Sequence, residues 1–321
     1  MKLRTEITIR PNDHKIDQQQ RVFMVGSCFT EEIASRLVRI GIPTLSNPLG
    51  VLYNPLSVES CIRRVVEAQK IEREELHCKG DMWFSLDTHG SFDSPDPQRV
   101  LESVNGSIVE AHKEFSQADW LIVTLGTAMV YERAGKVVAN CHRMSASEFT
   151  HRLMTIEEVS ESLERIVEMA AGKHVIFTLS PVRYVGYGLE GNMVSKSILR
   201  LAIERVVAAH SEVEYFPSYE IFLDDLRDYR YYGDDMLHPS KAGVDYVWER
   251  FGEYCLTREV EADGELFARL TDARNHRPLH PESSEYATFC DTMFRKARTL
   301  AHKFPKNEIA ASLVKHFAER N

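Results

Sequence analysis

The sequence lacks a long apolar run. No stretch of its 321 residues approaches the roughly 20 apolar residues that a membrane-spanning helix needs. The first residues, MKLRTEITIRPNDHK, are polar and alternating, without the apolar centre of a secretory signal. We therefore expect no membrane partner and a cytoplasmic location.

Cysteine is scarce and scattered, which argues against two classes of small stabilised fold. The six cysteines, at positions 28, 61, 78, 141, 255 and 290, include no C-x-x-C pair. A zinc ribbon and a disulfide framework are therefore both poorly supported, and reduced thiols fit better. His77, Cys78 and His89 do not form a recognised ligand spacing. We expect no metal site.

The sequence also lacks an excess of positive charge, internal repeats and low-complexity tracts. Its net charge is −9 and its pI is about 5.8. Phosphate binding usually requires a basic face, so nucleic acid is not an expected partner. Hydrophobic residues make up 43% and charged residues 27%, which is ordinary for a globular protein with a large core.

Short apolar runs do occur, and they alternate with amphipathic stretches, which is typical of a parallel sheet with crossover helices. The predicted strands are 22–25, 42–45, 120–125, 174–179 and 213–216. The predicted helices are 30–40, 57–68 (with Ser57 as N-cap), 97–115, 155–171, 192–210 and 240–256. A hairpin is expected over 129–140, and residues 70–96 read as an excursion from the sheet. We predict a three-layer α/β/α sandwich of about five parallel strands.

Residues 257–321 carry only helical periodicity. We therefore predict a main α/β domain over 1–256 and a helical C-terminal extension over 257–321. The apolar helices of this extension suit either dimerisation or coverage of the sheet, and the sequence leaves the oligomeric state open.

Ligands of such sheets bind at the carboxyl ends of the strands, which directs attention to the residues that follow each strand. Asp235 and His238, beyond the last strand, are three residues apart and can face the same way. A carboxylate beside an imidazole fixes its tautomer and stabilises the imidazolium. The alternative is a surface histidine in an acidic loop.

Ser27 follows the first strand and precedes a helix. A nucleophilic serine needs a base, and it gains from a helix N-terminus whose N–H groups stabilise an oxyanion. An N-cap serine is the simpler explanation, but the two roles are compatible. A thiol mechanism through Cys28, with His142 or His238 as base, is the rival arrangement.

These residues resemble a known family. Gly26-Ser27-Cys28-Phe29-Thr30 resembles the GSCFA signature, with Thr30 in place of the final alanine. Further similar stretches are GVLYNP (50–55), TLGTAMVY (124–131), ANCH (139–142), SPVR (180–183) and PSYEI (217–221). GSCFA domains belong to the SGNH, or GDSL-like, hydrolase superfamily, and the D-x-x-H of residues 235–238 resembles its last block. The resemblance extends over about residues 26–251.

The resemblance implies a flavodoxin-like, SGNH hydrolase-like fold and a Ser-His-Asp triad of Ser27, His238 and Asp235. It also implies an oxyanion hole, and the implied chemistry requires no cofactor. The backbone N–H of Ser27 and Gly50 would supply two donors. The superfamily's G-x-N-D block has no asparagine here, so Thr127, at the equivalent strand end, is the first candidate for the third donor.

Four residues are candidates for substrate binding: Asn54, Asn140, His142 and Arg183. The two asparagines are also alternatives as the third oxyanion donor. Arg183 suits an anionic substrate group or a salt bridge within the chain. A histidine in a turn such as His142 is more often bonded only to backbone.

The sequence thus predicts a serine esterase or acyltransferase that acts on a small-molecule acyl ester or an acylated carbohydrate. The alternative is a non-catalytic module that binds a small acylated or carbohydrate ligand in the same cleft. The natural substrate, the choice between hydrolysis and transfer, and the role of Cys28 stay open.

Overall fold

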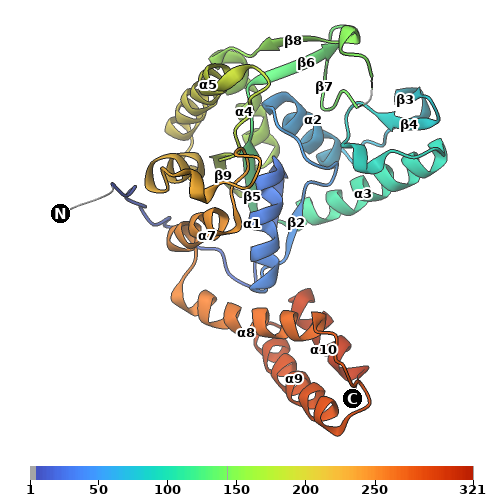
Figure 1. The fold of residues 1–321 in the computed structure, drawn as a ribbon, viewed down its shortest axis with the longest axis vertical. Helices are drawn as coiled ribbons and strands as arrows, with labels where there is room; N and C mark the ends of the chain where they lie inside the picture. Colours follow the sequence, from blue (N-terminus) through green and yellow to red (C-terminus); the bar gives the residue numbers. More distant parts are fainter. Residues whose placement is uncertain (1–4, 143, 321) are drawn as a thin grey trace. The chain divides into compact units, whose positions relative to one another are not determined.

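The computed structural model describes residues 5–142 and 144–320 (Figure 1). Its main sheet has five strands in the order β10-β9-β5-β1-β2. Their bounds are Val22–Gly26 (β1), Thr44–Ser46 (β2), Trp120–Leu125 (β5), His174–Leu179 (β9) and Val213–Phe216 (β10). Strand β9 pairs in parallel with both β5 and β10. Numbered among themselves, the five strands run 2-1-3-4-5, the flavodoxin-like order, so the predicted α/β class is confirmed.

Helices connect these strands and supply the core. They are Cys28–Arg39 (α1), Pro55–Val66 (α2), Pro97–Gln117 (α3), Ile156–Met169 (α4), Gly188–Ala209 (α5), Ser218–Glu220 (α6) and Lys241–Cys255 (α7). Apolar side chains of β1, β5 and β9 form one buried cluster with those of α2, α3, α4 and α5. Short helical turns cover Arg73–Glu75, Gly90–Phe92, Ala146–Glu148, Ile221–Asp225 and Tyr229–Tyr231.

The predicted N-cap of α2 was wrong, and the helices predicted from 30 and 192 also begin earlier, at Cys28 and Gly188. Helix α2 is capped by Asn54, whose side-chain oxygen accepts from the Ser57 N–H at 2.9 Å. The helix begins earlier than expected because Pro55, which has no N–H to lose, suits the first helical position. Ser57 therefore lies inside the first turn.

Two excursions leave the main sheet. The first contains an antiparallel hairpin of β3 (Leu76–Lys79) and β4 (Met82–Ser85). The second is an antiparallel sheet of β6 (Met129–Arg133), β7 (Lys136–Val138) and β8 (Thr150–Leu153). The expected hairpin turn is confirmed: Ala134 and Gly135 have φ of +50° and +77°, as a two-residue turn of this kind requires. Strand β8 was not foreseen.

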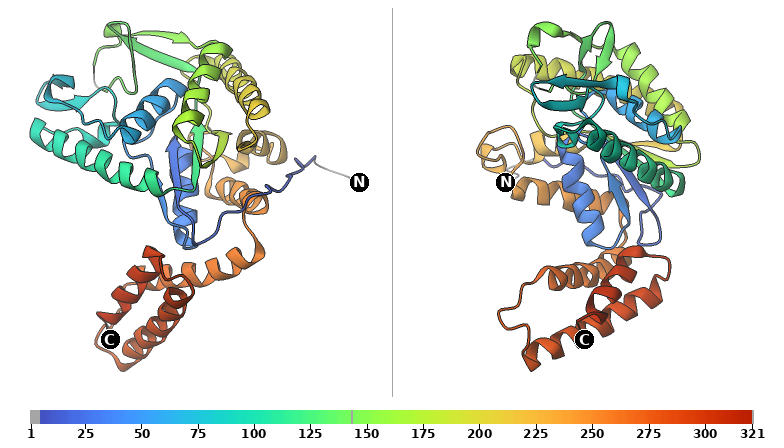
Figure 2. Two further views of the ribbon diagram at one scale, coloured as in Figure 1. Left: turned by 180° about the vertical axis from the view of Figure 1, so that it is seen from behind. Right: turned by 90° about the vertical axis from the view of Figure 1, so that its right-hand side faces the viewer.

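The chain divides into two compact units. The first contains Phe23–Glu32, Leu45–Val247 and a short N-terminal segment. The second contains Ile9–Val22, Ile33–Thr44 and the chain from Trp248 onward, including α8 (Arg258–Asn275), α9 (Ser284–Lys303) and α10 (Glu308–Ala318). These last helices lie side by side around their own apolar core (Figure 2).

Contacts within the second unit join segments that are far apart in the sequence. The Asn307 side-chain amide donates to the carbonyls of Gln18 and Gly41, at 2.7 Å each. The C-terminal helices are thus bonded to N-terminal segments of the chain. The domain boundary at 256/257 stays a prediction. No helix formed by residues 5–142 or 144–320 has the length and apolar character needed to cross a bilayer.

Candidate active site

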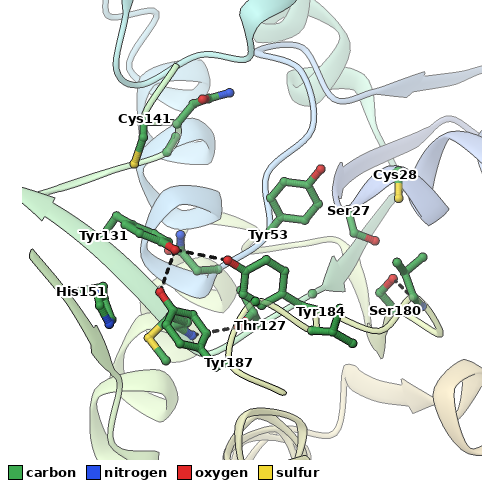
Figure 3. Close-up of a pocket in the computed structure, with 18 of the residues that line it drawn as sticks. Ser27, Cys28, Tyr53, Thr127, Tyr131, Cys141, His151, Ser180, Tyr184 and Tyr187 are labelled. Atoms are coloured by element: carbon green, nitrogen blue, oxygen red, sulfur yellow. Dashed lines mark hydrogen bonds between the residues drawn. The ribbon is translucent and has the colours of Figure 1, made fainter. Parts of the chain in front are cut away.

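The carboxyl ends of the main strands border a cavity of about 880 Å³. Small-molecule sites span about 300–1,000 Å³, so this cavity lies in the upper part of that range. Its walls come from the turn after β1, the end of β5, the loop after β9, the chain before α7 and the small β6–β8 sheet (Figure 3). The flavodoxin-like order reverses between β1 and β5, where such folds bind their ligands.

Ser27 lies at the end of β1, in a turn that only glycine permits at the preceding position. Gly26 has φ of +149°, and a Cβ built there would lie 2.2 Å from the carbonyl oxygen of Thr124 in β5. The Ser27 backbone N–H donates to the same carbonyl at 3.0 Å. Ser27 is 1% exposed, and its buried hydroxyl has no hydrogen-bond partner among the described residues. An unpaired buried hydroxyl is uncommon in proteins and marks this side chain for a functional explanation.

Asp235 and His238 form a short local pair. The Asp235 Oδ2 lies 2.6 Å from His238 Nδ1, and Oδ1 accepts from the backbone N–H groups of Leu237 and His238 at 2.9 Å each. These bonds lower the Asp235 pKa to about 2. The bond from the His238 N–H has the largest effect, followed by those from the Leu237 N–H and the His238 ring. Because Nδ1 faces the carboxylate, Nε2 is the nitrogen left to accept a proton.

The structure thus brings Ser27 and His238 to one cavity, since both side chains line it. No hydrogen bond joins their side chains among the bonds of the described residues. Catalytic hydrogen bonds are often long or unformed without substrate, so this separation is compatible with a triad.

The sequence-predicted oxyanion donors are already bonded within the chain. The Ser27 N–H donates to the Thr124 carbonyl, as described above. The Gly50 N–H donates to the Asn47 carbonyl at 2.8 Å, and the Thr127 N–H donates to the Tyr53 carbonyl at 3.0 Å. The Thr127 hydroxyl bonds to the Ser195 hydroxyl at 3.0 Å and accepts from the Met129 N–H at 3.0 Å. Thr127 lines the cavity, whereas Gly50 does not.

Gly50 has a structural reason of its own to be glycine. Its φ is +81°, and an added Cβ would lie 2.2 Å from the Cβ of His89. The position therefore requires glycine whether or not its N–H meets a substrate.

Cys28 begins helix α1 and also lines the cavity. Burial raises the pKa of its thiol, although the N–H groups of Phe29 and of Cys28 itself favour the thiolate. The thiol form is a weak nucleophile, because thiolate is the reactive species. The Cys28 environment therefore does not resemble that of an activated cysteine.

Two of the four substrate-binding candidates have structural roles. Asn54 uses both ends of its amide on Ser57 as the cap of α2. His142 is buried, with Nε2 2.7 Å from the Ser85 carbonyl, Nδ1 3.3 Å from an Asp93 oxygen and its ring stacked on Phe84 at 4.5 Å. Asn54 still borders the cavity, whereas His142 does not.

Asn140 lines the cavity and uses its side-chain oxygen to accept from the His142 N–H at 2.7 Å. Among the hydrogen bonds of the described residues, its side-chain nitrogen makes none. It is thus a polar donor that the chain leaves available at the cavity.

Arg183, also on the cavity wall, is bonded to the loop that carries His238. Its backbone N–H donates to Leu237 at 3.3 Å and its guanidinium donates to the Met236 carbonyl. The guanidinium lies over the rings of Tyr229 and Tyr232, at 5.3 and 4.2 Å. No ion pair with a carboxylate is formed by Arg183 in the described part of the chain. Of the two alternatives for Arg183, the internal salt bridge is therefore absent from residues 5–142 and 144–320.

Sequence reasoning missed two features. The first is an aromatic group on the cavity wall, whose members are Tyr131, His151, Tyr184 and Tyr187; Tyr131 enters the sequence analysis only within the TLGTAMVY stretch. The second is Lys196 on α5, which is 2% exposed and donates from Nζ to the Ser180 carbonyl at 2.7 Å. The only signal for the first was the tyrosine-rich stretch directly after β9. No group of His, Cys, Asp or Glu within residues 5–142 and 144–320 could hold a metal ion.

The fold and cavity define a parallel α/β protein with a serine at the end of its first strand and an Asp–His pair before its last main-domain helix. The chain belongs to the GSCFA family, whose model matches residues 21–251. The model of the GSCFA domain protein C-terminal domain matches residues 267–315. No curated protein matches the chain significantly.

Two solved structures resemble the chain at low similarity. A family 3 carbohydrate esterase of Clostridium thermocellum is 11% identical, with a TM-score of 0.34, over 76% of this chain and 98% of that one. The acetyl xylan esterase Est2A of the rumen bacterium Butyrivibrio proteoclasticus is 12% identical, with a TM-score of 0.34, over 73% of this chain and 64% of that one.

Proposed function

We propose that this protein is an SGNH-type serine hydrolase that cleaves or transfers the acyl group of a small-molecule ester. The observation that carries the proposal is the pairing of Asp235 with His238, at 2.6 Å, beside a cavity that also contains the unpaired hydroxyl of Ser27. A nucleophile, a base and a group that orients the base are the three parts that acyl transfer needs.

In this mechanism the Ser27 oxygen attacks the ester carbonyl while His238 Nε2 takes the hydroxyl proton. The carboxylate of Asp235 stabilises the imidazolium that forms. The tetrahedral intermediate collapses, the C–O bond to the alcohol breaks, and His238 returns the proton to the departing alcohol. Water or an acceptor alcohol then attacks the acyl-serine by the same proton exchange, which restores Ser27.

The oxyanion hole can draw on several donors around the cavity. Use of the Ser27, Gly50 and Thr127 N–H groups requires each to exchange a backbone carbonyl for the substrate oxygen. The start of α1 offers an alternative, since the first N–H groups of a helix have no intrahelical acceptor and carry partial positive charge. The side-chain nitrogen of Asn140 is a further donor on the same cavity.

Arg183 acts here as a positioning residue for His238. Its contacts with Met236 and Leu237 hold the loop in which the Asp–His pair lies. Two tyrosine rings of the same region stack on its guanidinium, which keeps the side chain in place. This role accounts for an arginine at position 183 without requiring that the substrate carry an anionic group.

The decisive experiment replaces Ser27 with alanine and measures hydrolysis of 4-nitrophenyl acetate. Loss of a triad nucleophile typically costs about 10³-fold or more in kcat. Cys28→Ala is the matched control, because it alters the adjacent side chain on the same wall. Loss of activity in Ser27→Ala with retention in Cys28→Ala is expected, and the reverse pattern would assign the reaction to the thiol.

A fluorophosphonate probe separates catalysis from mere binding. It should label the wild-type protein at Ser27 and leave Ser27→Ala unlabelled, as peptide mass spectrometry can establish. A wild-type protein that resists labelling and turns over no ester would instead be a binding module.

A further inference from the structure

The cavity has an aromatic wall that the proposed triad does not use. In Figure 3, Tyr131, His151 and Tyr187 lie across the cavity from Ser27, with Tyr184 between them. The His151 ring lies 5.0 Å from that of Tyr187 and 5.8 Å from that of Tyr131. These residues come from β6, β8 and the loop after β9, so three separate elements converge on one wall.

The three tyrosine hydroxyls of this wall are bonded to one another. Tyr187 donates to the Tyr131 oxygen at 2.7 Å, and the Tyr131 and Tyr184 oxygens are 3.2 Å apart. Three hydroxyls carry three donors and six lone pairs, and the two bonds use two of each. Four lone pairs and one O–H donor therefore remain for a ligand at this point of the wall. The free donor belongs to Tyr184 or to Tyr131, depending on which of the two donates to the other.

The three tyrosines of this wall are uncharged. Burial raises the pKa of Tyr131 and of Tyr187, and burial together with the bond to Tyr131 raises that of Tyr184 to about 12. The phenols are therefore neutral hydrogen-bonding groups at physiological pH.

The remaining surroundings are largely apolar. Met129, Met144 and Phe149 line the same cavity. Among the described residues that line it, none is aspartate or glutamate, and the Arg183 guanidinium donates to the Met236 carbonyl and lies over two tyrosine rings. The cavity thus offers aromatic and thioether surfaces beside the tyrosine hydroxyls, with Asn140 as a further polar group of the lining.

Three ligand chemistries fit this composition poorly. A sugar carries hydroxyls around its whole rim, and those facing the methionines and Phe149 would be buried without partners, which is costly. A plain alkyl chain would leave the spare tyrosine donor unpaired. A cationic group would find no carboxylate in the described lining.

We infer that the far part of the cavity is a subsite for an aromatic ring with a hydroxyl at its distal end, attached to the ester that Ser27 attacks. The ring stacks on the aromatic side chains and contacts the thioethers, and its hydroxyl joins the Tyr131–Tyr184–Tyr187 chain. The inference rests on the proposed esterase function for the reaction, but the binding of the ring does not. The ring can belong to the acyl or to the alcohol part of the ester.

The test compares matched esters. The acyl-side pair is methyl 3-(4-hydroxyphenyl)propanoate and methyl 3-phenylpropanoate, the alcohol-side pair is 2-(4-hydroxyphenyl)ethyl acetate and 2-phenylethyl acetate, and ethyl acetate is the reference. We expect kcat/KM to be higher for aryl esters than for ethyl acetate. Within one pair, the hydroxyl should raise it about two- to tenfold, the range of one hydrogen bond. The pair that responds identifies the side of the ester that enters the subsite.

Tyr184→Phe keeps the ring and removes one hydroxyl of the chain, so the ratio of kcat/KM within the responding pair should fall towards about one. Tyr286→Phe is the control, because its hydroxyl accepts from Arg320 and its side chain does not line the cavity. The inference is overturned if the ratio is the same in wild type and Tyr184→Phe, or if ethyl acetate matches the aryl esters. Melting temperatures of both variants report whether they fold.

A binding measurement keeps the subsite testable if no ester is hydrolysed. Titration calorimetry with 3-(4-hydroxyphenyl)propanamide, which has no ester bond, should give a Kd that rises about two- to tenfold in Tyr184→Phe. Binding without turnover supports the subsite and refutes the esterase. Turnover of ethyl acetate without amide binding refutes the subsite and leaves the esterase standing.

Discussion

Replacing Lys196 with methionine should change how the stability of the protein depends on pH. Lys196 is 2% exposed, its Nζ donates to the Ser180 carbonyl at 2.7 Å and lies 5.1 Å from the centre of the Tyr219 ring. It forms no ion pair with a carboxylate among the described residues. Burial lowers its pKa from 10.5 to about 7, although Cys28 and Glu220 favour the ammonium. Methionine has a similar length and no charge.

The direction in which stability changes with pH follows from proton binding to Lys196. Between pH 7 and 10.5 the unfolded chain holds more protons on this lysine than the folded chain does, so the free energy of unfolding rises with pH. The penalty is complete below about pH 7 and absent above about pH 10.5. Its full size is on the order of 5 kcal/mol, at about 1.36 kcal/mol for each of the 3.5 pH units. Linkage gives a gain of about 1.5 kcal/mol between pH 7 and pH 8.5.

The assay is urea denaturation of wild type and Lys196→Met at pH 7 and pH 8.5. The advantage of the variant should shrink by about 1.5 kcal/mol over this interval, because only the wild type gains. The variant also loses the hydrogen bond to Ser180, which changes its free energy of unfolding by the same amount at both pH values. Cysteines that titrate in this range are present in both proteins, so their effect cancels in the difference. Lys241→Met, at a lysine whose side chain is 87% exposed, is the control. Parallel pH curves for wild type and Lys196→Met would refute the reasoning.

Three further predictions concern the site and its supports. Asp235→Asn should lower kcat by up to about 10⁴-fold in steady-state assays, because the imidazole loses the carboxylate that orients it; a loss below tenfold would contradict this role. Gly26→Ala should lower the free energy of unfolding by about 3 kcal/mol or more, because its Cβ would lie 2.2 Å from a backbone oxygen. The control Gly106→Ala, in a helix with open space at the Cβ position, should be neutral or stabilising in the same urea titration. Arg183→Met should lower kcat about tenfold with little change in KM if the residue positions the Asp–His loop, whereas a change mainly in KM would indicate contact with substrate.

Much of the main sheet could be predicted from the sequence because local patterns decide it. The runs at 120–125 and 174–179 are continuous and apolar, as expected for strands buried on both faces, and both strands occur at those residues. Asp235 and His238 were also foreseeable as a pair, because their contact lies within a single turn of chain.

The rest of the site depends on contacts between distant segments. Tyr131 and Tyr187 are bonded although 56 residues apart, and neither position carries a local signal for the other. The carbonyl that accepts from Ser27 belongs to Thr124, so the state of the expected oxyanion donor follows from packing of β1 against β5. Lys196 resembles an ordinary helix residue in the sequence, and only the packing of α5 shows that it is buried.

The small β6–β8 sheet is inserted between β5 and α4, and it supplies much of the wall opposite Ser27. Its strands pair with one another and not with the main sheet. In the proposed mechanism and subsite, the part of the wall that this sheet supplies therefore lies in a different stretch of the chain from Ser27, Asp235 and His238, whereas Tyr184 and Tyr187 come from the loop after β9. Under the proposed mechanism, changes within residues 129–153 would alter what enters the cavity without altering the turn that holds Ser27, so relatives that share Ser27, Asp235 and His238 need not share a substrate.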